Sequence, residues 1–535
     1  MTVEGNKVVV SGSATVDGDV HGAYVDSEFS TVAQNIVVIA NGTVKGNVFG
    51  GGTWWGDYMA GSPQNVVNNT VVLGAADGEG TATIKGNVYI NWHKFKEEMT
   101  EDGAVVAVSG GNLNVYNTGN TVDGDVHAPG ANINFYVKDG ETDTSTPRLE
   151  VKAGSKAYFD NANIKVNVKQ LGTIAEDTKY NLFGTSTIEG TPSYTITDDF
   201  IDSSTSLVTT GADKGKVILN HANDRANENS KSPSETQIVG VALVNGVMDM
   251  MANQGINEAA KAVGNNDGGR SMAPFAAVGG SRMRQNSGSY VDMNTWNVGI
   301  GFAKEVTNSH GKLMFGPVVE YGKGTYNSYL DNGVHGSGDS SFWGVGAMMK
   351  QENKDGLYYE GSFRVGRLKN DYESRLAGGA SYENSATFYA LHAGVGKVVK
   401  LNEDDTMDYY GKLFYTRQGS SSATLNTGHI YDFHAINSFR TRLGLRYTHR
   451  MNKNQDVYAG IAWQHEFGSK ANATIHSGMY SVSAPSPSVK GETGIFELGM
   501  KVRPSNGKFE SNFGFLGSIG KQRGVGFNAQ FQWNF

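Results

Sequence analysis

The C-terminal half of the chain alternates polar and apolar residues with a period of two. The last eleven residues read Val-Gly-Phe-Asn-Ala-Gln-Phe-Gln-Trp-Asn-Phe. Successive side chains of a β-strand point to opposite faces, so this segment has one apolar and one polar face. The same division recurs in twelve short segments, near 272–283, 292–305, 312–323, 339–350, 356–369, 385–400, 406–417, 436–450, 456–468, 489–502, 508–519 and 524–535.

The connections between these segments alternate in length. Short polar ones lie near 306–311, 351–355, 401–405, 451–455 and 503–507, and mostly longer ones near 284–291, 324–338, 370–384, 418–435 and 469–488. An even number of strands with aromatic ends, tight turns on one rim and loops on the other is typical of a transmembrane β-barrel. The alternative is a soluble antiparallel sandwich or barrel, whose polar face would meet water.

Residues 231–264 are predicted to form a helix inside the pore of this barrel. Ser234 and Gln237 fit a capping box, and Gly264 fits the position after the helix C-terminus. The segment is too polar to lie in lipid, since it carries Asp249 and several asparagines. About 29 helical residues would span roughly 43 Å, which is enough to cross a membrane-sized pore. The alternative is an amphipathic linker on the periplasmic side.

The first 230 residues contain a repeated four-residue motif. It reads Gly-Asp-Val-His, Gly-Asn-Val-Phe, Gly-Asn-Val-Tyr and Gly-Asp-Val-His at 18–21, 46–49, 86–89 and 124–127, always after a Thr-Val or Thr-Ile pair. Short strands that recur with uneven insertions predict the coils of a β-solenoid, with an irregular β-sandwich as the alternative. His21 and His127 occupy equivalent positions in the motif, which favours a structural role for both.

Charge and cysteine content exclude several classes of protein. Residues 1–234 hold 16 Lys and Arg against 28 Asp and Glu, a net charge of −12, and residues 235–535 hold 29 against 25, a net charge of +4. Nothing in this balance indicates nucleic-acid binding. The chain has no cysteine, which excludes disulfides, Cys-ligated metals and a Cys nucleophile. It also lacks a run of about 18 apolar residues, so no transmembrane helix is predicted.

The order of these parts resembles that of the autotransporter family of type V secretion. The resemblance rests on the twelve alternating segments, the helix and the ending Phe531-Gln532-Trp533-Asn534-Phe535. It implies an all-β chain with a β-solenoid passenger at 1–230, a linker helix at 231–264 and a twelve-stranded translocator barrel at 265–535. It also implies that Phe531, Trp533 and Phe535 form the signal that the barrel-assembly machinery reads.

The resemblance further implies a monomer in the bacterial outer membrane that translocates its own passenger and displays it on the cell surface. Its partners would be outer-membrane lipid, the barrel-assembly machinery and periplasmic chaperones. We expect the passenger to be adhesive, with a ligand on a host or neighbouring cell. Two other functions remain open: an outer-membrane pore with a soluble periplasmic front domain, and a secreted hydrolase anchored by the barrel.

The sequence departs from the family in two respects. No signal peptide follows Met1, so we expect a longer natural chain. Some members cleave themselves at an Asn-Asn pair inside the pore helix. Here the only nearby pair, Asn265-Asn266, lies beyond the expected helix, so we expect the passenger to stay attached.

Candidate functional residues fall into two groups. Nine charged residues share the polar face of their strands and are expected to face the lumen: Glu320, Glu360, Arg364, Arg440, Arg442, Arg446, Glu466, Glu497 and Lys501. Three aromatic residues follow a glycine triplet and could bind a surface ligand: Trp54, Trp55 and Tyr58.

Enzymatic motifs are weak. The sequence contains neither GxSxG nor HExxH. Gly338-Asp339-Ser340 is similar to hydrolase motifs but falls in a predicted surface loop, and His429 and His434 fall in another. We therefore expect no enzymatic activity, no metal and no cofactor.

Overall fold

The computed structural model describes residues 1–26, 30–54, 64–94, 106–141, 145–257, 259–260, 272–504 and 509–533. The chain forms two compact units, which are described separately. One comprises Met1–Arg225 with Gly478–Tyr480, and the other comprises Ala226–Ser477 with Ser481–Phe535.

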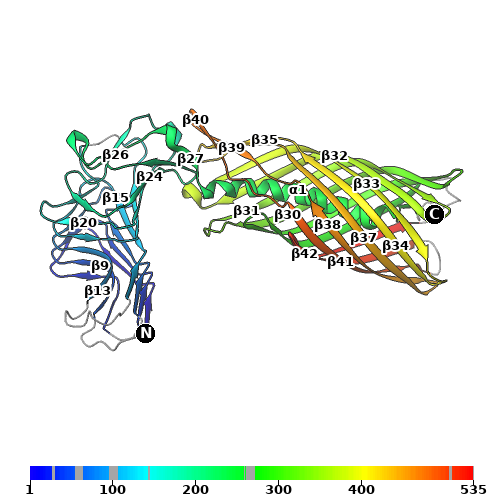
Figure 1. Cartoon of the computed structure of the whole chain (residues 1–535), viewed down its shortest axis with the longest axis horizontal. Coiled ribbons are helices and arrows are strands. Elements are labelled where there is room, and N and C mark those ends of the chain that lie inside the picture. Colours follow the sequence, from blue (N-terminus) through cyan, green and yellow to red (C-terminus); the bar gives the residue numbers. More distant parts are fainter. Residues whose placement is uncertain are drawn as a thin grey trace. The chain divides into compact units, whose positions relative to one another are not determined.

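The N-terminal unit is a β-solenoid built mostly from parallel strand pairs, although Ser193–Thr197 pairs antiparallel with Ile201–Thr205 (Figure 1). Four strands form the first sheet: β1 (Thr2–Glu4), β6 (Thr31–Ala33), β10 (Gln64–Val67) and β14 (Val106–Ser109). Nine strands form the second: β2 (Lys7–Val10), β7 (Ile36–Ile39), β11 (Thr70–Leu73), β15 (Asn112–Tyr116), β18 (Asn132–Tyr136), β21 (Asn163–Asn167), β24 (Ser193–Thr197), β25 (Ile201–Thr205) and β27 (Asp224–Ala226).

Two further parallel sheets complete the coils. One contains β3 (Ala14–Val16), β8 (Gly42–Val44), β12 (Ala82–Ile84), β16 (Asn120–Val122) and β19 (Leu149–Val151). The other contains β4 (Val20–His21), β5 (Tyr24–Val25), β9 (Val48–Trp54), β13 (Val88–Lys94), β17 (Val126–His127), β20 (Lys156–Tyr158) and β23 (Thr187–Glu189). An antiparallel pair, β22 (Lys179–Asn181) and β26 (Lys216–Ile218), and the 3-10 helices η1 (Leu171–Thr173), η2 (Gly211–Asp213) and η3 (His221–Asn223) follow. The predicted solenoid is therefore confirmed.

The repeated motif supplies three kinds of contact between coils. Its valines are buried in the core. Its second residues form a ladder in which Asn47 Oδ1 accepts from the Asn87 amide at 2.8 Å, and Asn87 Oδ1 accepts from the Asp125 amide at 2.7 Å. Its fourth residues stack ring on ring, with centroid distances of 4.4 Å for His21 to Phe49 and 4.6 Å for Tyr89 to His127.

The ring stack continues beyond the last copy of the motif. His127 stacks on Tyr158 at 4.8 Å, and β20 carries Ala157 where the motif has valine. The sequence at 155–158 is Ser-Lys-Ala-Tyr, so the repeat continues with its glycine lost. This coil was not predicted from the motif because only the buried small residue and the ring are retained.

The second unit is a closed antiparallel barrel of twelve strands, as predicted (Figure 1). Its strands are β28 (Ala273–Asn286), β29 (Tyr290–Thr307), β30 (Gly311–Tyr329), β31 (His335–Asn353), β32 (Leu357–Ser374), β33 (Ser381–Lys400), β34 (Asp405–Gln418), β37 (Ile436–Asn452), β38 (Gln455–Glu466), β41 (Gly491–Val502), β42 (Phe509–Gly520) and β43 (Gln522–Trp533). β43 pairs with β28 and so closes the ring.

Several barrel strands are longer than the alternation predicts. The connections expected near 324–338 and 370–384 shrink to 330–334 and 375–380, the second of which holds the 3-10 helix η7 (Leu376–Gly378). In these extensions the strands still pair through backbone hydrogen bonds. Their outward side chains are polar, so the alternation of apolar and polar residues fades. The two longest connections carry a separate sheet of β35 (Ser421–Thr424), β36 (Ile430–Phe433), β39 (Ala473–Ser477) and β40 (Tyr480–Ser483).

The outward face of the barrel is apolar. Ile300, Val319, Leu443 and Phe515 are each more than half exposed to the surroundings, with exposed fractions of 55%, 60%, 53% and 68%. Such an exposed apolar surface is stable in a lipid environment and costly in water.

Among the described residues, no helix combines the length and the apolarity needed to cross a bilayer.

The ring stack predicts a pH dependence of the solenoid. Burial lowers the pKa of His21 and of His127 in the stack. Outside the stack, burial lowers the pKa of His93 to about 4, and this contribution remains when the stacked histidines are replaced. Because the folded pKa lies below the unfolded value of about 6.5, protons bind the unfolded chain more strongly and stability falls as the pH drops below about 6.5. Hydrogen exchange of the β9, β13 and β17 amides in the detergent-solubilised full chain, corrected for intrinsic rates, should lose about tenfold protection from pH 7 to pH 5.

A His21→Phe/His127→Phe variant provides the control. Phenylalanine retains the ring contact but cannot titrate, so the variant should show a smaller loss of protection over the same interval. An unchanged pH dependence in this variant would contradict the assignment to the stacked histidines.

Candidate functional site inside the barrel

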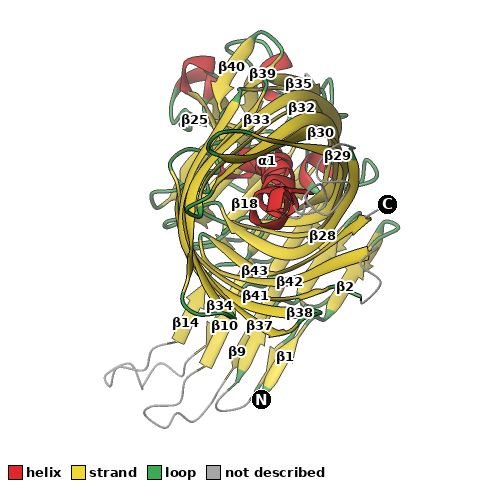
Figure 2. Cartoon of the chain, turned by 90° about the vertical axis from the view of Figure 1, so that its right-hand side faces the viewer, coloured by secondary structure: helices red, strands yellow, loops and turns green. Residues whose placement is uncertain are grey.

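A single helix lies in the bore of the barrel. Helix α1 (Ser232–Met250) follows the short helix η4 (Glu228–Lys231) and continues into a π-helical turn, η5 (Met251–Gly255). Viewed along the barrel in Figure 2, barrel strands surround α1. Its first six residues are all buried, although five of them carry polar side chains: Ser232, Ser234, Glu235, Thr236 and Gln237.

The predicted capping box is wrong. The helix begins at Ser232, with Lys231 at the N-cap and no side-chain cap hydrogen bond. Because η4 runs directly into α1 and Pro233 fits the first turn, Ser234 already lies within the helix. Gln237 instead accepts a hydrogen bond from Gln418 at 2.6 Å. Gly264 lies outside the described residues.

The first turn of the helix is fixed by side chains from the loop rim. Ser289 Oγ donates to Glu235 Oε1 at 2.6 Å, in the turn between β28 and β29. Tyr372 OH donates to Ser232 Oγ at 2.8 Å, and Tyr382 OH donates to the Pro233 carbonyl at 2.7 Å. These contacts place the N-terminal end of α1 at the rim that carries the long connections.

The middle of the helix packs closely on the barrel wall. A Cβ at Gly240 would lie 2.3 Å from Leu368 Cδ2, so glycine allows the close approach there. Apolar helix residues pack with inward aromatic residues of the strands, including Phe342, Phe388 and Phe414. The bore is therefore not uniformly polar, because the apolar side of the helix needs apolar partners.

Toward the C-terminal end of α1, Asp249 lies between two arginines of β37. Its carboxylate is 2.9 Å from Arg440 Nη1 and 2.8 Å from Arg442 Nη2. Both arginines are almost completely buried, and both lie over the ring of Phe414. Arg442 Nη1 also donates to Asn253 Oδ1 at 3.0 Å. We call Asp249, Arg440, Arg442 and Asn253 the helix clamp.

The far end of the helix lies toward the rim of short turns. Arg446 donates to the Asn253 carbonyl at 3.2 Å, and Lys412 donates to the Ala252 carbonyl. Lys350, three residues before the end of β31, donates to Asn257 Oδ1 at 2.8 Å. The chain therefore runs through the bore from the loop rim to the turn rim before β28 begins.

The structure places all nine charged residues expected in the lumen on the inward side. Arg440, Arg442 and Arg446 contact the helix, whereas the others pair mainly within the wall. Their partners are Arg364 with Glu320 at 2.8 Å, Glu360 with Lys412 at 2.6 Å, Arg446 with Glu497 at 2.7 Å, Glu466 with Ser438 at 2.5 Å, and Lys501 with Glu510 at 2.8 Å.

The sequence analysis missed several members of this network. Lys412 and His392 both face Glu360, at 2.6 and 3.3 Å. Lys412 is next to the outward Leu413 on β34, so the alternation along this strand already indicated that Lys412 points inward. The tyrosines that hold the first helical turn gave no such signal, because alternation alone does not say how far a ring reaches.

The other candidate residues are not gathered into one site. Phe531 lies in β43, half-buried, and Trp533 is the last residue of that strand, whereas Phe535 lies outside the described residues. Trp54 ends β9, and Trp55 and Tyr58 lie outside the described residues.

The residues set aside as weak enzymatic candidates contact neighbouring side chains. Ser340 lies in β31 rather than in a surface loop, and its hydroxyl donates to Asn370 Oδ1 at 2.7 Å. His429 Nδ1 lies 3.1 Å from the Thr427 hydroxyl, and His434 Nε2 lies 3.2 Å from the Thr474 hydroxyl. In the part of the chain that the structure describes, no three His, Asp or Glu residues are arranged to hold a metal ion.

The barrel residues match a known protein family. Residues 275–509 match the family model of the autotransporter beta-domain. Similar solved structures include the beta domain of the Bordetella autotransporter BrkA, at 16% identity and a TM-score of 0.40, with 49% of this chain and 99% of that chain covered. No curated protein sequence matches the chain.

Two other similar structures are translocator units. For the translocator domain of NalP from Neisseria meningitidis, the identity is 14%, the TM-score is 0.41, and the match covers 55% of this chain and 99% of that chain. For the transport unit of AIDA-I from Escherichia coli, the identity is 13% and the TM-score is 0.42, and the match covers 52% of this chain and 97% of that chain.

The helix clamp should stabilise the helix in its position inside the bore. Asp249→Asn would leave Arg440 and Arg442 buried without a carboxylate, which costs about 3 kcal/mol or more. The equilibrium between the helix inside the bore and the helix displaced from it should shift by about a hundredfold toward the displaced helix. The ion conductance of the barrel in planar bilayers should therefore rise.

A matched control removes an ion pair that lies only between strands. Glu320→Gln/Arg364→Gln takes both partners from β30 and β32 and should leave the conductance near that of the parent protein. Equal conductance of Asp249→Asn and the parent would show that the clamp does not hold the helix.

Proposed function

Since the barrel of this chain is an autotransporter beta-domain and lies in the outer membrane, we propose that the protein carries its own N-terminal solenoid to the cell surface and keeps it there. The observation that carries this proposal is the direction of α1. Its N-terminal end is bound by Ser289, Tyr372 and Tyr382 at the loop rim, and its far end is bound by Lys350 at the turn rim.

Membrane barrels of this class have short periplasmic turns and longer extracellular loops. Residue 231, which immediately precedes the helix, would then leave the bore on the extracellular side. The solenoid precedes residue 231 in the chain and would therefore be displayed outside. This direction of the helix favours display over a pore with a periplasmic front domain.

In this proposal, folding of the solenoid outside the cell drives its passage through the barrel. The chain has no nucleotide-binding motif of the type GxxxxGK[ST], so movement would be biased by folding of the solenoid outside. Each coil buries its motif valine and stacks its ring on the coil before it, so folding can proceed coil by coil. The absence of cysteine suits passage through a narrow bore, because no disulfide can form beforehand.

Three finer assignments belong to the same proposal. The passenger is an adhesin whose acidic surface meets a ligand on another cell, with Trp54, Trp55 and Tyr58 as candidate contacts. Phe531, Trp533 and Phe535 form the signal for the barrel-assembly machinery, which acts with periplasmic chaperones. The helix interior has no Asn-Asn pair, which supports a passenger that stays attached.

Protease treatment of intact cells tests the display. Proteinase K should remove residues 1–230 from the parent protein in intact cells while the barrel stays protected, as followed by antibodies against each part. A periplasmic protein serves as the control for membrane integrity. Full protection of residues 1–230 until the outer membrane is permeabilised would contradict the proposal.

A further inference from the structure

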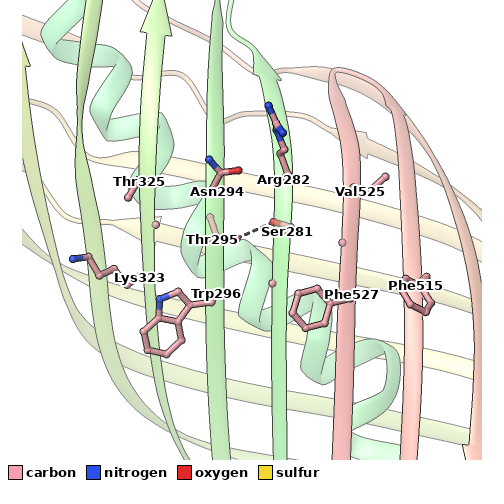
Figure 3. A pocket seen from close by; sticks show the side chains of 13 residues that line it. Ser281, Arg282, Asn294, Thr295, Trp296, Lys323, Thr325, Phe515, Val525 and Phe527 are labelled. Carbon is pink, nitrogen blue, oxygen red and sulfur yellow. Dashed lines mark hydrogen bonds between the residues drawn. The ribbon is translucent and has the colours of Figure 1, made fainter.

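The outward face of the barrel has a groove where the first and last strands meet. The groove has a volume of about 660 Å³, within the range of pockets that hold small ligands. Trp296 on β29 and Phe527 on β43 both pair across β28 with Gly280, and Phe515 pairs with Phe527 from β42. Figure 3 shows Trp296, Phe527 and Phe515 at one level on neighbouring strands, with Arg282 at another level on the strand between Trp296 and Phe527.

The groove crosses the boundary between apolar and polar outward surface. On β29 the outward residues Phe302, Ile300 and Trp296 are about half exposed and apolar, and the next outward residue is Asn294. On β30 the series Val319 and Tyr321 likewise gives way to polar residues. The polar residues lie on the side of the loop rim, so the groove has an apolar half toward the turn rim and a half toward the loop rim that is polar except for Val525 of β43, which pairs with Arg282.

Two cations border the polar half. Arg282 is exposed on β28, and the described residues include no carboxylate within ion-pair distance of it. Lys323 lies 3.1 Å from Asp339, so its charge is already shared. Asn294 and Thr325 lie beside them and offer uncharged hydrogen-bonding groups.

A second outward groove provides a contrast. It is lined by Tyr321, Trp343, Arg367 and Lys369, but it also contains Glu383, which lies 2.9 Å from Lys369. Arg367 donates to Ser385 at 2.7 Å. We call the first groove, where β28 lies between β29 and β43, the seam groove. The cations of the second groove have partners within the protein, whereas Arg282 in the seam groove faces outward without an acidic partner among the described residues.

We propose that the seam groove binds the phosphorylated glycolipid of the outer leaflet, with a phosphate on Arg282 and an acyl chain against Trp296 and Phe527. A guanidinium binds phosphate through paired, charge-assisted hydrogen bonds. Asn294 and Thr325 would face the sugar hydroxyls. The choice of the outer leaflet rests on the orientation proposed above, whereas the groove and its charge do not depend on it.

Lipid binding to the detergent-solubilised full chain tests this proposal. Native mass spectrometry would compare lipid A with two phosphates, the same lipid after phosphate removal, and phosphatidylglycerol. The parent protein should bind the phosphorylated lipid A most tightly. Arg282→Gln should weaken that binding about tenfold and should abolish the preference over the dephosphorylated lipid.

Two further variants separate the parts of the site. Trp296→Ala should weaken the binding of both forms of lipid A, because it removes one wall of the apolar half. Lys304→Gln removes an outward cation of β29 near the turn rim and should leave binding within about twofold of the parent.

Three outcomes would overturn the proposal: equal affinity of Arg282→Gln and the parent, equal affinity for the phosphorylated and dephosphorylated lipid, or binding of phosphatidylglycerol as tight as that of lipid A. None of them depends on where the solenoid lies. Failure here would therefore leave the protease result on surface display unaffected.

Discussion

The backbone of a strand in lipid must find every hydrogen-bond partner within the protein, because hydrocarbon offers none. The pairing of β43 with β28 meets this requirement by leaving no sheet edge open. Closure in turn creates an interior, and the period-two alternation makes that interior polar where the exterior is apolar. The charged residues of the bore therefore follow from the same constraint that closes the sheet.

A bore of this kind requires partners for its buried charges. Much of the wall pairs with itself, as Arg364 does with Glu320, but Arg440 and Arg442 depend on Asp249 of the helix. A buried ion pair contributes little net stability, whereas removal of one partner is costly. The clamp thus specifies where the helix sits along the bore, and the rim tyrosines specify which end faces the loops.

The architecture could be predicted from the sequence because two periodic patterns indicate it directly: the alternation along the barrel strands and the repeated motif of the solenoid. Alternation along Phe439–Tyr447 and its counterparts marks strands wherever lipid imposes an apolar outward face. Where strands rise above the lipid, as in β30 and β31, water accepts any outward residue and the prediction ended too early. The solenoid was predicted from four copies of a motif, and the coil at Tyr158 was missed because its glycine and its Asp or Asn are replaced by Ser155 and Lys156.

The inward position of the charged residues also follows from parity, but their partners do not. Nothing in the spacing of Asp249 and Arg440, 191 residues apart, predicts their contact, since it depends on how deep the helix lies. The predicted start of the helix was wrong for a related reason. A local capping box at Ser234 was outweighed by the preceding turn and by hydrogen bonds from distant strands.

The claim on which the account depends is that α1 fills the bore at this depth. The chain contains no cysteine, so a single introduced pair can report it. Thr416 Oγ1 donates to Asn245 Oδ1 at 2.7 Å, whereas the nearby Leu413 faces outward. Oxidation of an Asn245→Cys/Thr416→Cys protein in outer membranes should give a cross-link that alters the mobility of the denatured chain, and an Asn245→Cys/Leu413→Cys protein should give none. Failure of the first pair to cross-link, or equal cross-linking of both, would contradict the account.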